Sequence, residues 1–199
     1  MTKKEIKQLF LNELYEPYKN CNACPLGSLG RKKVVFGRGN PDAKLMLIGE
    51  GPGRDEDLQG IPFVGRSGKL LTTVLASLGI EESEVYITNI VKCRPPKNRT
   101  PSPEESNTCM KTLLEKQLSI VQPLAICTLG ACATKTLLKS SLEISKLRGT
   151  IQSYLSIPVI PTYHPAYILR TPKKLPVLAD DLKLAIKESK IQMKNNFIT

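Results

Sequence analysis

The stretch that decides the fold is AKLMLIGEGPGRDEDLQGIPFVGRSGK, residues 43–69. Its first eight residues, 43–50, form a short apolar run bounded by turn-forming residues, which predicts a buried parallel strand. A loop rich in glycine and proline follows, and residues 67–79 then show the periodicity of a helix that closes at Gly79. A buried strand, a loop and a helix in this order are typical of an α/β protein.

Strands and helices alternate along the rest of the chain as well. The patterns predict strands over 85–93, 124–130 and 157–164, and helices over 2–16, 103–121, 131–140 and 176–192. In the N-terminal helix the stripe expected to face the core contains Ile6, Leu9, Phe10, Glu13 and Leu14. Four alternations of strand and helix imply a parallel sheet with helices on both faces. The last residues, 193–199, are expected to be frayed.

Length and composition indicate one ordinary globular domain over residues 1–199, with 41% hydrophobic and 24% charged residues. We expect a cytoplasmic protein without a membrane segment, because no apolar stretch approaches the roughly 20 residues of a spanning helix. The net charge is +11, from 29 Lys and Arg against 18 Asp and Glu. Such an excess favours a polyanionic partner such as nucleic acid, although it also serves solubility.

Six cysteines in a cytosolic chain do not indicate disulfides. Cys21 and Cys24 form a C-x-x-C motif in a loop, Cys93 follows the second predicted strand, and Cys109 lies in the next helix. Four such cysteines can converge on zinc or on an iron–sulfur cluster, and the spacing alone favours structural zinc. The other two, Cys127 and Cys132, are expected to be small buried hydrophobic residues.

The segments after the first, second and fourth strands are the richest in chemically active side chains: GEGPGRDED, TNIVKC and YHPAYILR. Ligands of parallel sheets bind at the carboxyl ends of the strands, so a pocket is expected there. The first segment is not a nucleotide-binding loop. Arg54 replaces the third glycine of the dinucleotide fingerprint, and Phe63 replaces the first glycine of a Walker loop.

Within that first segment, Glu50 is expected at the mouth of the pocket. The acidic run Asp55, Glu56 and Asp57 argues against a phosphate at the same place, and we expect Asp57 at least to be solvated. Phe63 has two interpretations: an ordinary core aromatic, or a flat face on which a base stacks.

Asn89 and His164 follow the second and fourth strands. The Asn89 amide could read the polar edge of a base, or it could simply satisfy backbone groups at the strand end. His164 is the only histidine, so metal ligation is not expected, and a hydrogen-bond donor or acid is the functional interpretation. Leu169 and Arg170, expected on a loop opened by Pro165, suit insertion into a duplex and a phosphate contact, or ordinary packing.

Four segments in series resemble the family 4 uracil-DNA glycosylases, the iron–sulfur branch of their superfamily. They are the C-x-x-C motif, LIGEGPGRDEDLQGIPFVGRSGK, YITNIVKCRPPKNRTPSPEE followed by Cys109, and TYHPAYILR. Each is weak alone, but their order from Cys21 to Arg170 covers about three-quarters of the chain. The resemblance implies a three-layer α/β/α fold with a four-stranded parallel sheet.

The resemblance also implies a monofunctional repair enzyme that flips uracil out of DNA, hydrolyses its N-glycosidic bond and leaves an abasic site. Phe63 would then stack on the base, Asn89 would bond N3–H and O4, and His164 would bond O2. Glu50 and the backbone at Gly51 would shape the pocket. In place of zinc, it implies a structural 4Fe-4S cluster held by Cys21, Cys24, Cys93 and Cys109.

Some branches of the superfamily place a water-orienting Asp in the first motif, where this chain has Glu50-Gly51. Asp55 or Glu56 could reach in, so the water activator stays open. A related branch that traps uracil-DNA through a His in an inserted loop is excluded, since no such insertion is present.

We expect a monomer acting on single- or double-stranded DNA; no motif for a sliding-clamp contact was found. Two rivals remain: a non-catalytic nucleic-acid module with a zinc site, and a small-molecule enzyme with the same pocket.

Overall fold

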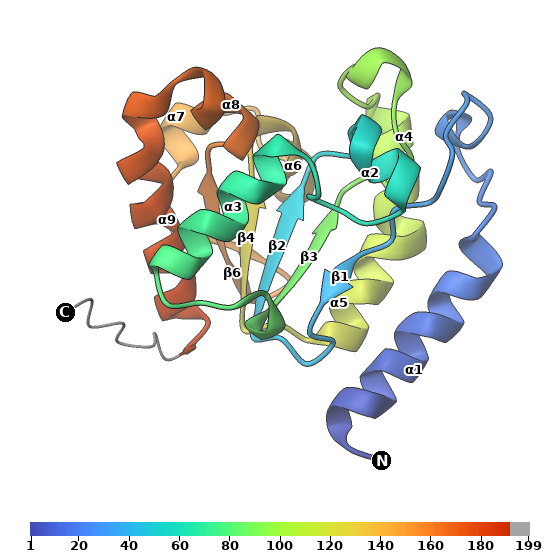
Figure 1. Ribbon diagram of the computed structural model, residues 1–199, viewed down its shortest axis with the longest axis horizontal. Helices are drawn as coiled ribbons and strands as arrows, with labels where there is room; N and C mark the ends of the chain where they lie inside the picture. Colours follow the sequence, from blue (N-terminus) through green and yellow to red (C-terminus); the bar gives the residue numbers. More distant parts are fainter. Residues whose placement is uncertain (192–199) are drawn as a thin grey trace.

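The computed structural model describes residues 1–191, which form one six-stranded sheet with helices on both faces (Figure 1). The strand order is β1-β3-β2-β4-β6-β5. The four central strands run parallel: β3 (Val85–Asn89), β2 (Leu45–Gly49), β4 (Ala125–Leu129) and β6 (Ile157–Thr162). Residue 192, predicted as a helix end, and the tail 193–199 lie outside the described residues.

This parallel core confirms the expected four strands. Every residue of β2, β3 and β4 is buried, as continuous apolar or β-branched runs covered on both faces require. Two short antiparallel edge strands were not predicted: β1 (Arg38–Gly39) on β3, and β5 (Gln152–Tyr154) on β6. Strands of two and three residues are too short to produce a readable alternation.

Two groups of helices cover the sheet. One face packs on α1 (Lys3–Tyr15), α4 (Pro103–Cys109), a π turn (Met110–Leu114), α5 (Glu115–Val121) and α6 (Ala131–Leu138). The other packs on α3 (Arg66–Ser77), α8 (Pro165–Arg170) and α9 (Leu175–Glu188). Two further short helices are α2 (Arg54–Gln59) and α7 (Ile144–Leu147). The expected α/β/α layering is thus present.

The stripe predicted for α1 is correct only at Leu14, which is half-buried and packs against the core, whereas Glu13 is exposed. Ile6, Leu9 and Phe10 are exposed, whereas Lys7 and Leu11 are buried. Hydrogen bonds explain why Lys7 points inward. Its ammonium donates to the Val121 carbonyl, at the end of α5, at 2.6 Å and to Asp42 at 2.7 Å. An unpaired backbone carbonyl and a carboxylate can draw a lysine inward against a hydrophobic pattern.

Three local predictions also need correction. The second strand ends at Asn89 rather than continuing to Cys93, and the segment between leaves the sheet. Leu169 and Arg170 lie on a helix, α8, because Pro165 occupies its first turn instead of opening a loop. The loop after β2 contains helix α2. No helix among residues 1–191 has the length and apolarity to cross a membrane.

Candidate active site and cysteine cavity

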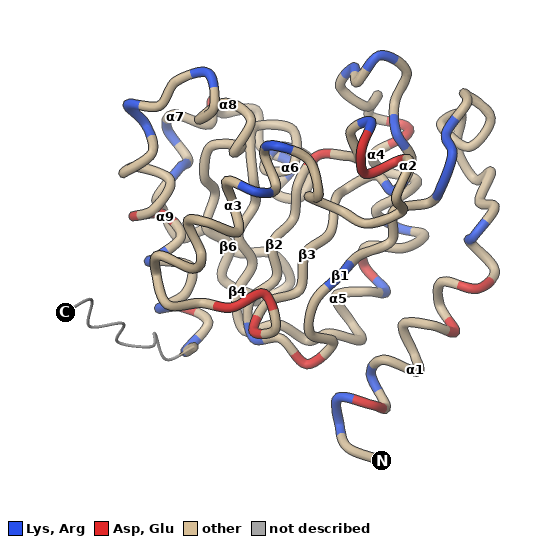
Figure 2. Tube along the Cα trace, in the orientation of Figure 1, with Lys and Arg blue, Asp and Glu red and all other residues tan. Residues whose placement is uncertain are grey.

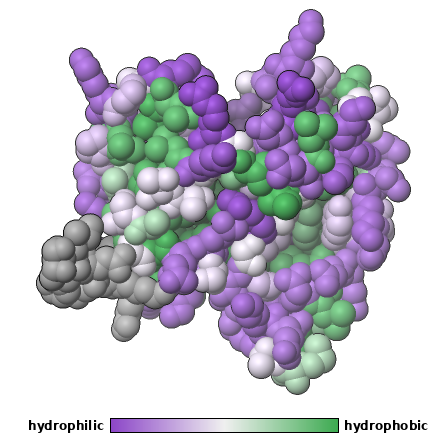
Figure 3. Space-filling model, viewed as in Figure 1, coloured by the Kyte–Doolittle hydropathy of each residue, from purple (hydrophilic) through white to green (hydrophobic). Residues whose placement is uncertain are grey.

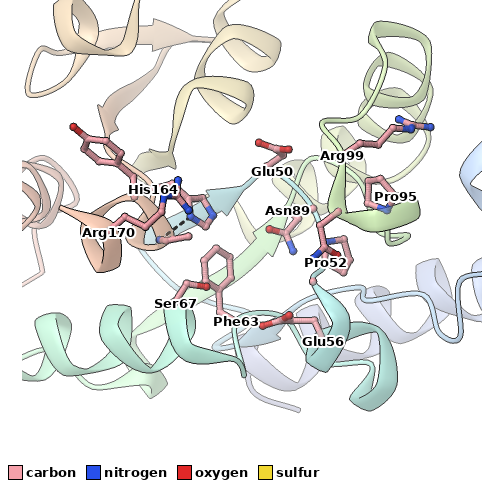
Figure 4. A pocket seen from close by; sticks show the side chains of 15 residues that line it. Glu50, Pro52, Glu56, Phe63, Ser67, Asn89, Pro95, Arg99, His164 and Arg170 are labelled. Atoms are coloured by element: carbon pink, nitrogen blue, oxygen red, sulfur yellow. Dashed lines mark hydrogen bonds between the residues drawn. The ribbon is translucent and has the colours of Figure 1, made fainter. Parts of the chain in front are cut away.

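A cavity of about 480 Å³ opens at the carboxyl ends of β2, β3 and β6. Glu50, Phe63, Asn89 and His164, the four residues singled out in the sequence, all line it (Figure 4). The structure adds lining residues that sequence reasoning missed: Ser67, Pro95, Asn98, Arg99 and Tyr167. The loop after Cys93, rich in proline and arginine, was the available signal for three of them.

Phe63 is buried, with 6% of its surface exposed, and its ring forms part of the cavity wall. It lies against the His164 ring, with centroids 5.9 Å apart and planes inclined by 25°. Its φ of 55° is in the left-handed region, a strained conformation for an aromatic residue. The surroundings hold it there: Arg38 donates to its carbonyl at 3.2 Å. Glu56 accepts the next two backbone N–H groups at 3.0 and 2.9 Å.

Two glycines make room for this arrangement. A Cβ at Gly49 would lie 2.4 Å from Asn89 Oδ1 and 2.6 Å from Phe63 Cζ. A Cβ at Gly68 would overlap the Phe63 carbonyl. The missing side chain at position 49 therefore lets an aromatic face and an amide meet above the end of β2.

Asn89 is almost completely buried, with 1% exposed. Its Nδ2 makes no hydrogen bond with any residue in the described part of the chain. Burying an amide donor without a partner costs about 1–3 kcal/mol. The interpretation that Asn89 satisfies backbone groups at the strand end therefore fails for this nitrogen, and the amide is left available to a ligand.

His164 follows β6 and is the N-cap of α8, where its Nδ1 accepts the Ala166 N–H at 3.0 Å. Burial lowers the pKa of His164 to about 4, and the positive charge of Arg170 adds to the effect. The imidazole is therefore neutral at pH 7. Because Nδ1 is the acceptor, the proton resides on Nε2, which makes this atom a hydrogen-bond donor.

The acidic residues at positions 50 and 55–57 differ in their burial and in whether they line the cavity. Glu50 and Glu56 line the cavity, whereas Asp55 is exposed and does not. Burial raises the pKa of Glu50, against the opposing effect of hydrogen bonds with Thr100 and Cys132. The expectation that Asp57 is solvated was wrong: it is 3% exposed and accepts the Lys32 N–H at 2.8 Å. It anchors an adjacent loop.

Lys and Arg residues gather along the loop before α4 and around α8 (Figure 2), the two segments that contribute Arg99 and Arg170 to the cavity wall. The surface is hollowed between these two parts (Figure 3). The Arg99 guanidinium is already paired, since it donates two hydrogen bonds of 2.8 and 2.7 Å to the buried Glu105 carboxylate. Arg170 is exposed and has no acidic partner within residues 1–191, and its neighbour Leu169 is 38% exposed.

Cys21, Cys24, Cys93 and Cys109 line a second, small cavity beside the first. Apolar side chains complete its wall, among them Leu26, Val34 and Leu113. Burial raises the pKa of the Cys93 thiol to about 12, although the positive charge of Arg31 opposes this. Within residues 1–191, no three His, Cys, Asp or Glu side chains converge as ligands of one metal ion. The thiols surround a space instead.

The remaining cysteines lie outside that cavity. Cys127 is fully buried in β4, as expected. Cys132 is only half-buried and lies against Glu50. The expectation of a small buried residue is therefore confirmed for Cys127 and wrong for Cys132.

Residues 36–188 match the family model described as the uracil DNA glycosylase superfamily. This range contains every residue of the first cavity. The protein belongs to the uracil-DNA glycosylase superfamily. Membership agrees with the α/β fold and sets the reaction class, hydrolysis of an N-glycosidic bond.

Relatives within the superfamily confirm the more specific resemblance to family 4. The chain is 46% identical to the type-4 uracil-DNA glycosylase of Thermotoga maritima, over 85% of this chain and 86% of that protein. It is 41% identical to the type-4 enzyme of Sulfurisphaera tokodaii, with 87% and 82% covered. For the type-4 enzyme of Archaeoglobus fulgidus the identity is 40%, with 87% and 90% covered.

Proposed function

We propose that the first cavity binds uracil flipped out of DNA, and that the protein hydrolyses its N-glycosidic bond. The products are free uracil and an abasic site, as in the first step of base excision repair. The observation that carries this proposal is the buried Asn89 amide without a partner, next to the Phe63 ring and the neutral His164. A flat face, an amide and a donor are what a flipped pyrimidine needs.

Base recognition follows from the polarity of the amide. Asn89 donates from Nδ2 to O4 and accepts N3–H at Oδ1, while Phe63 stacks on the ring. Cytosine has an acceptor at N3 and a donor at N4, so both bonds would be reversed. Glu50 and the backbone at Gly51 complete the walls of the pocket.

The chemistry is the breaking of the C1′–N1 bond. Its electron pair goes to uracil, and the negative charge collects on O2. The Nε2–H of His164 is directed to that oxygen and stabilises the charge as it develops. Water then adds to C1′ and loses a proton, and the uracil anion takes up a proton from the solvent.

The water needs little activation if the bond to the base breaks first. Two backbone N–H groups engage the Glu56 carboxylate, whereas burial raises the pKa of Glu50 and so makes its carboxylate a better proton acceptor than an ordinary glutamate. Asp55 lies outside the cavity wall. Of the two carboxylates predicted to activate the water, only Glu56 lines the cavity, and that role stays a prediction.

The four-cysteine cavity is proposed to hold a 4Fe-4S cluster through Cys21, Cys24, Cys93 and Cys109. Four thiols that line one largely apolar cavity are the donor set that such a cluster requires. When bound, the cluster supplies a structural cross-link between the N-terminal loop, the segment after β3 and α4. These residues bind and orient; they take no part in the hydrolysis.

DNA is proposed to cross the basic edge that surrounds the pocket. Leu169 would enter the space left by the flipped nucleotide, and Arg170 would contact a phosphate. Single- and double-stranded substrates are both expected, with the protein acting as a cytoplasmic monomer built from one domain. A sliding-clamp contact has no support in these features.

The deciding experiment is alkaline cleavage of a uracil-containing oligonucleotide after incubation, with thymine and cytosine oligonucleotides as controls. Abasic product from the uracil strand alone is expected. No product from either single- or double-stranded substrate would contradict the proposal. It would favour a non-catalytic nucleic-acid module instead.

The variant Asn89→Asp tests base recognition in the same assay. A carboxylate cannot donate to O4 but can accept from the cytosine amino group, so the ratio of uracil to cytosine excision should fall by more than about tenfold. Unchanged selectivity would mean that Asn89 does not read the base.

A further inference from the structure

Lys92 is a fully buried lysine that the proposed hydrolysis does not use. Its exposed fraction is 0%, and it lies in the segment that joins the end of β3 to Cys93. Burying an ammonium group is costly unless hydrogen bonds replace its water. Its partners therefore indicate what the side chain is for.

On one side, Lys92 holds the end of β3. Its Nζ donates to the Asn89 carbonyl at 2.7 Å and to Thr88 Oγ1 at 2.5 Å. The Thr88 hydroxyl donates in turn to the Phe36 carbonyl at 2.7 Å, which leaves its lone pairs for the ammonium. Gln117 donates to the same carbonyl at 3.0 Å. The backbone that carries the Asn89 amide is thus fixed from inside the protein.

On the other side, Lys92 touches the cysteine cavity. Its backbone N–H donates to the Cys109 sulfur, and its side chain forms part of the cavity wall. Its carbonyl accepts the Val35 N–H at 2.7 Å, next to Val34 of the same wall. Lys92 therefore lines the cysteine cavity and bonds the backbone of Asn89, a residue that lines the first cavity.

We propose that Lys92 is a positioning residue for uracil recognition, which fixes the Asn89 amide and ties it to the four-cysteine site. The inference rests on the proposed function of Asn89. Its physical basis is that groups which read a substrate must be held closely, and that hydrogen bonds in a dry interior hold their partners firmly. A change at the cysteine cavity thereby reaches the base-reading amide through a single side chain.

The test is Lys92→Met, which keeps the length of the side chain and removes its charge and donors. Single-turnover excision of uracil should slow by about 10- to 100-fold, the range for losing a hydrogen bond from a charged group. The matched control is Lys7→Met. Lys7 is also a buried lysine bonded to a backbone carbonyl, that of Val121, but it lies away from both cavities. The control should lose stability and keep its rate per folded molecule.

A double-mutant cycle separates positioning from general damage. If Lys92 acts through Asn89, Lys92→Met should slow the Asn89→Ala variant no further. An equal slowing in both backgrounds, or a rate for Lys92→Met that matches Lys7→Met, would overturn the inference. Iron content, measured in parallel, should stay at the wild-type level.

If Lys92→Met fails to fold or loses its iron, the variant Thr88→Val tests the same role of Lys92. It removes one partner of the ammonium and leaves the Lys92 N–H on Cys109, so a smaller slowing is expected, again absent in the Asn89→Ala background. A wild-type rate for Thr88→Val would contradict the inference. An inactive wild-type protein would contradict the proposed function itself, whereas an active wild type with an equally active Lys92→Met would contradict only the role of Lys92.

Discussion

The proposed uracil pocket and the four-cysteine cavity are built in opposite ways. The pocket takes Glu50, Asn89 and His164 from the ends of three sheet strands, so the sheet itself sets their spacing. The cysteine cavity takes its residues from an N-terminal loop, the segment after β3 and the last residue of α4. No ladder of strands joins those pieces. The fold thus preorganises the pocket, whereas the proposed cluster would hold the pieces of the cysteine site together.

The largest expected effect comes from His164→Ala, which tests whether the pocket holds a preorganised donor. Losing a donor to the developing charge should reduce the single-turnover rate by about 10²–10³-fold. The control is His164→Asn, whose side-chain oxygen can still cap α8 at the Ala166 N–H. It should recover stability but not rate. A fully active alanine variant would show that the charge on O2 is stabilised elsewhere.

Gly49→Ala asks whether steric clearance, rather than any polar group, sets the pocket. The new Cβ would displace Phe63 or Asn89, so excision should fall by about 10- to 100-fold, in keeping with the cost of misplacing a reacting group. Overpacking should also cost about 1–3 kcal/mol of stability.

The control for this change is Gly39→Ala, whose Cβ would overlap the Val85 carbonyl at the start of β3, the end of that strand opposite the pocket. It should lose comparable stability while keeping its rate. Equal rates for the two variants would remove the special place given to Gly49.

Cys93→Ala tests the other half of the comparison, a site held together by its ligand. The variant should lose iron and its visible thiolate-to-iron absorption, with roughly 3–4 kcal/mol of the stability that a tightly bound group provides. Cys127→Ala, a buried cysteine outside the cavity, should keep its iron. Iron retained in the Cys93 variant, or stoichiometric zinc in an anaerobic wild-type preparation, would argue against the cluster.

The smallest effect concerns the acid–base state of the pocket. NMR titration of the single histidine should give a pKa of about 4. In the unfolded chain the pKa of this histidine is roughly 6.5, so between pH 6.5 and pH 4 the unfolded chain binds more protons than the folded protein. His164 therefore lowers the free energy of unfolding as the pH falls through this range. Arg170→Gln should raise the pKa, since it removes a positive charge. An ordinary value near 6.5 in the wild-type protein would undo the assignment of a neutral donor.

Sequence reasoning was most reliable where local patterns and topology agree. The four parallel strands follow from buried apolar runs, and the rule that ligands bind at strand ends selects the segments of Glu50, Asn89 and His164 from residue order alone. It failed where polar contacts between elements far apart in the sequence determine which side chains are buried. Lys7 turns inward to the end of α5, and Asp57 is buried to hold the loop at Lys32.

By itself, the sequence determined the α/β class, the family, the four cysteines of the second cavity and the segments that supply the pocket. These features depend on residue types and on their spacing along the chain. Both can be interpreted from local conformational preferences and from the order of the motifs. Only the tertiary structure decided that Asn89 Nδ2 is left without a partner in the described residues, that Gly49 clears space for Phe63, and that Lys92 bonds the Asn89 carbonyl. Each of these is a contact between side chain and backbone set by how strand ends and loops meet, a relation that no spacing in one dimension contains.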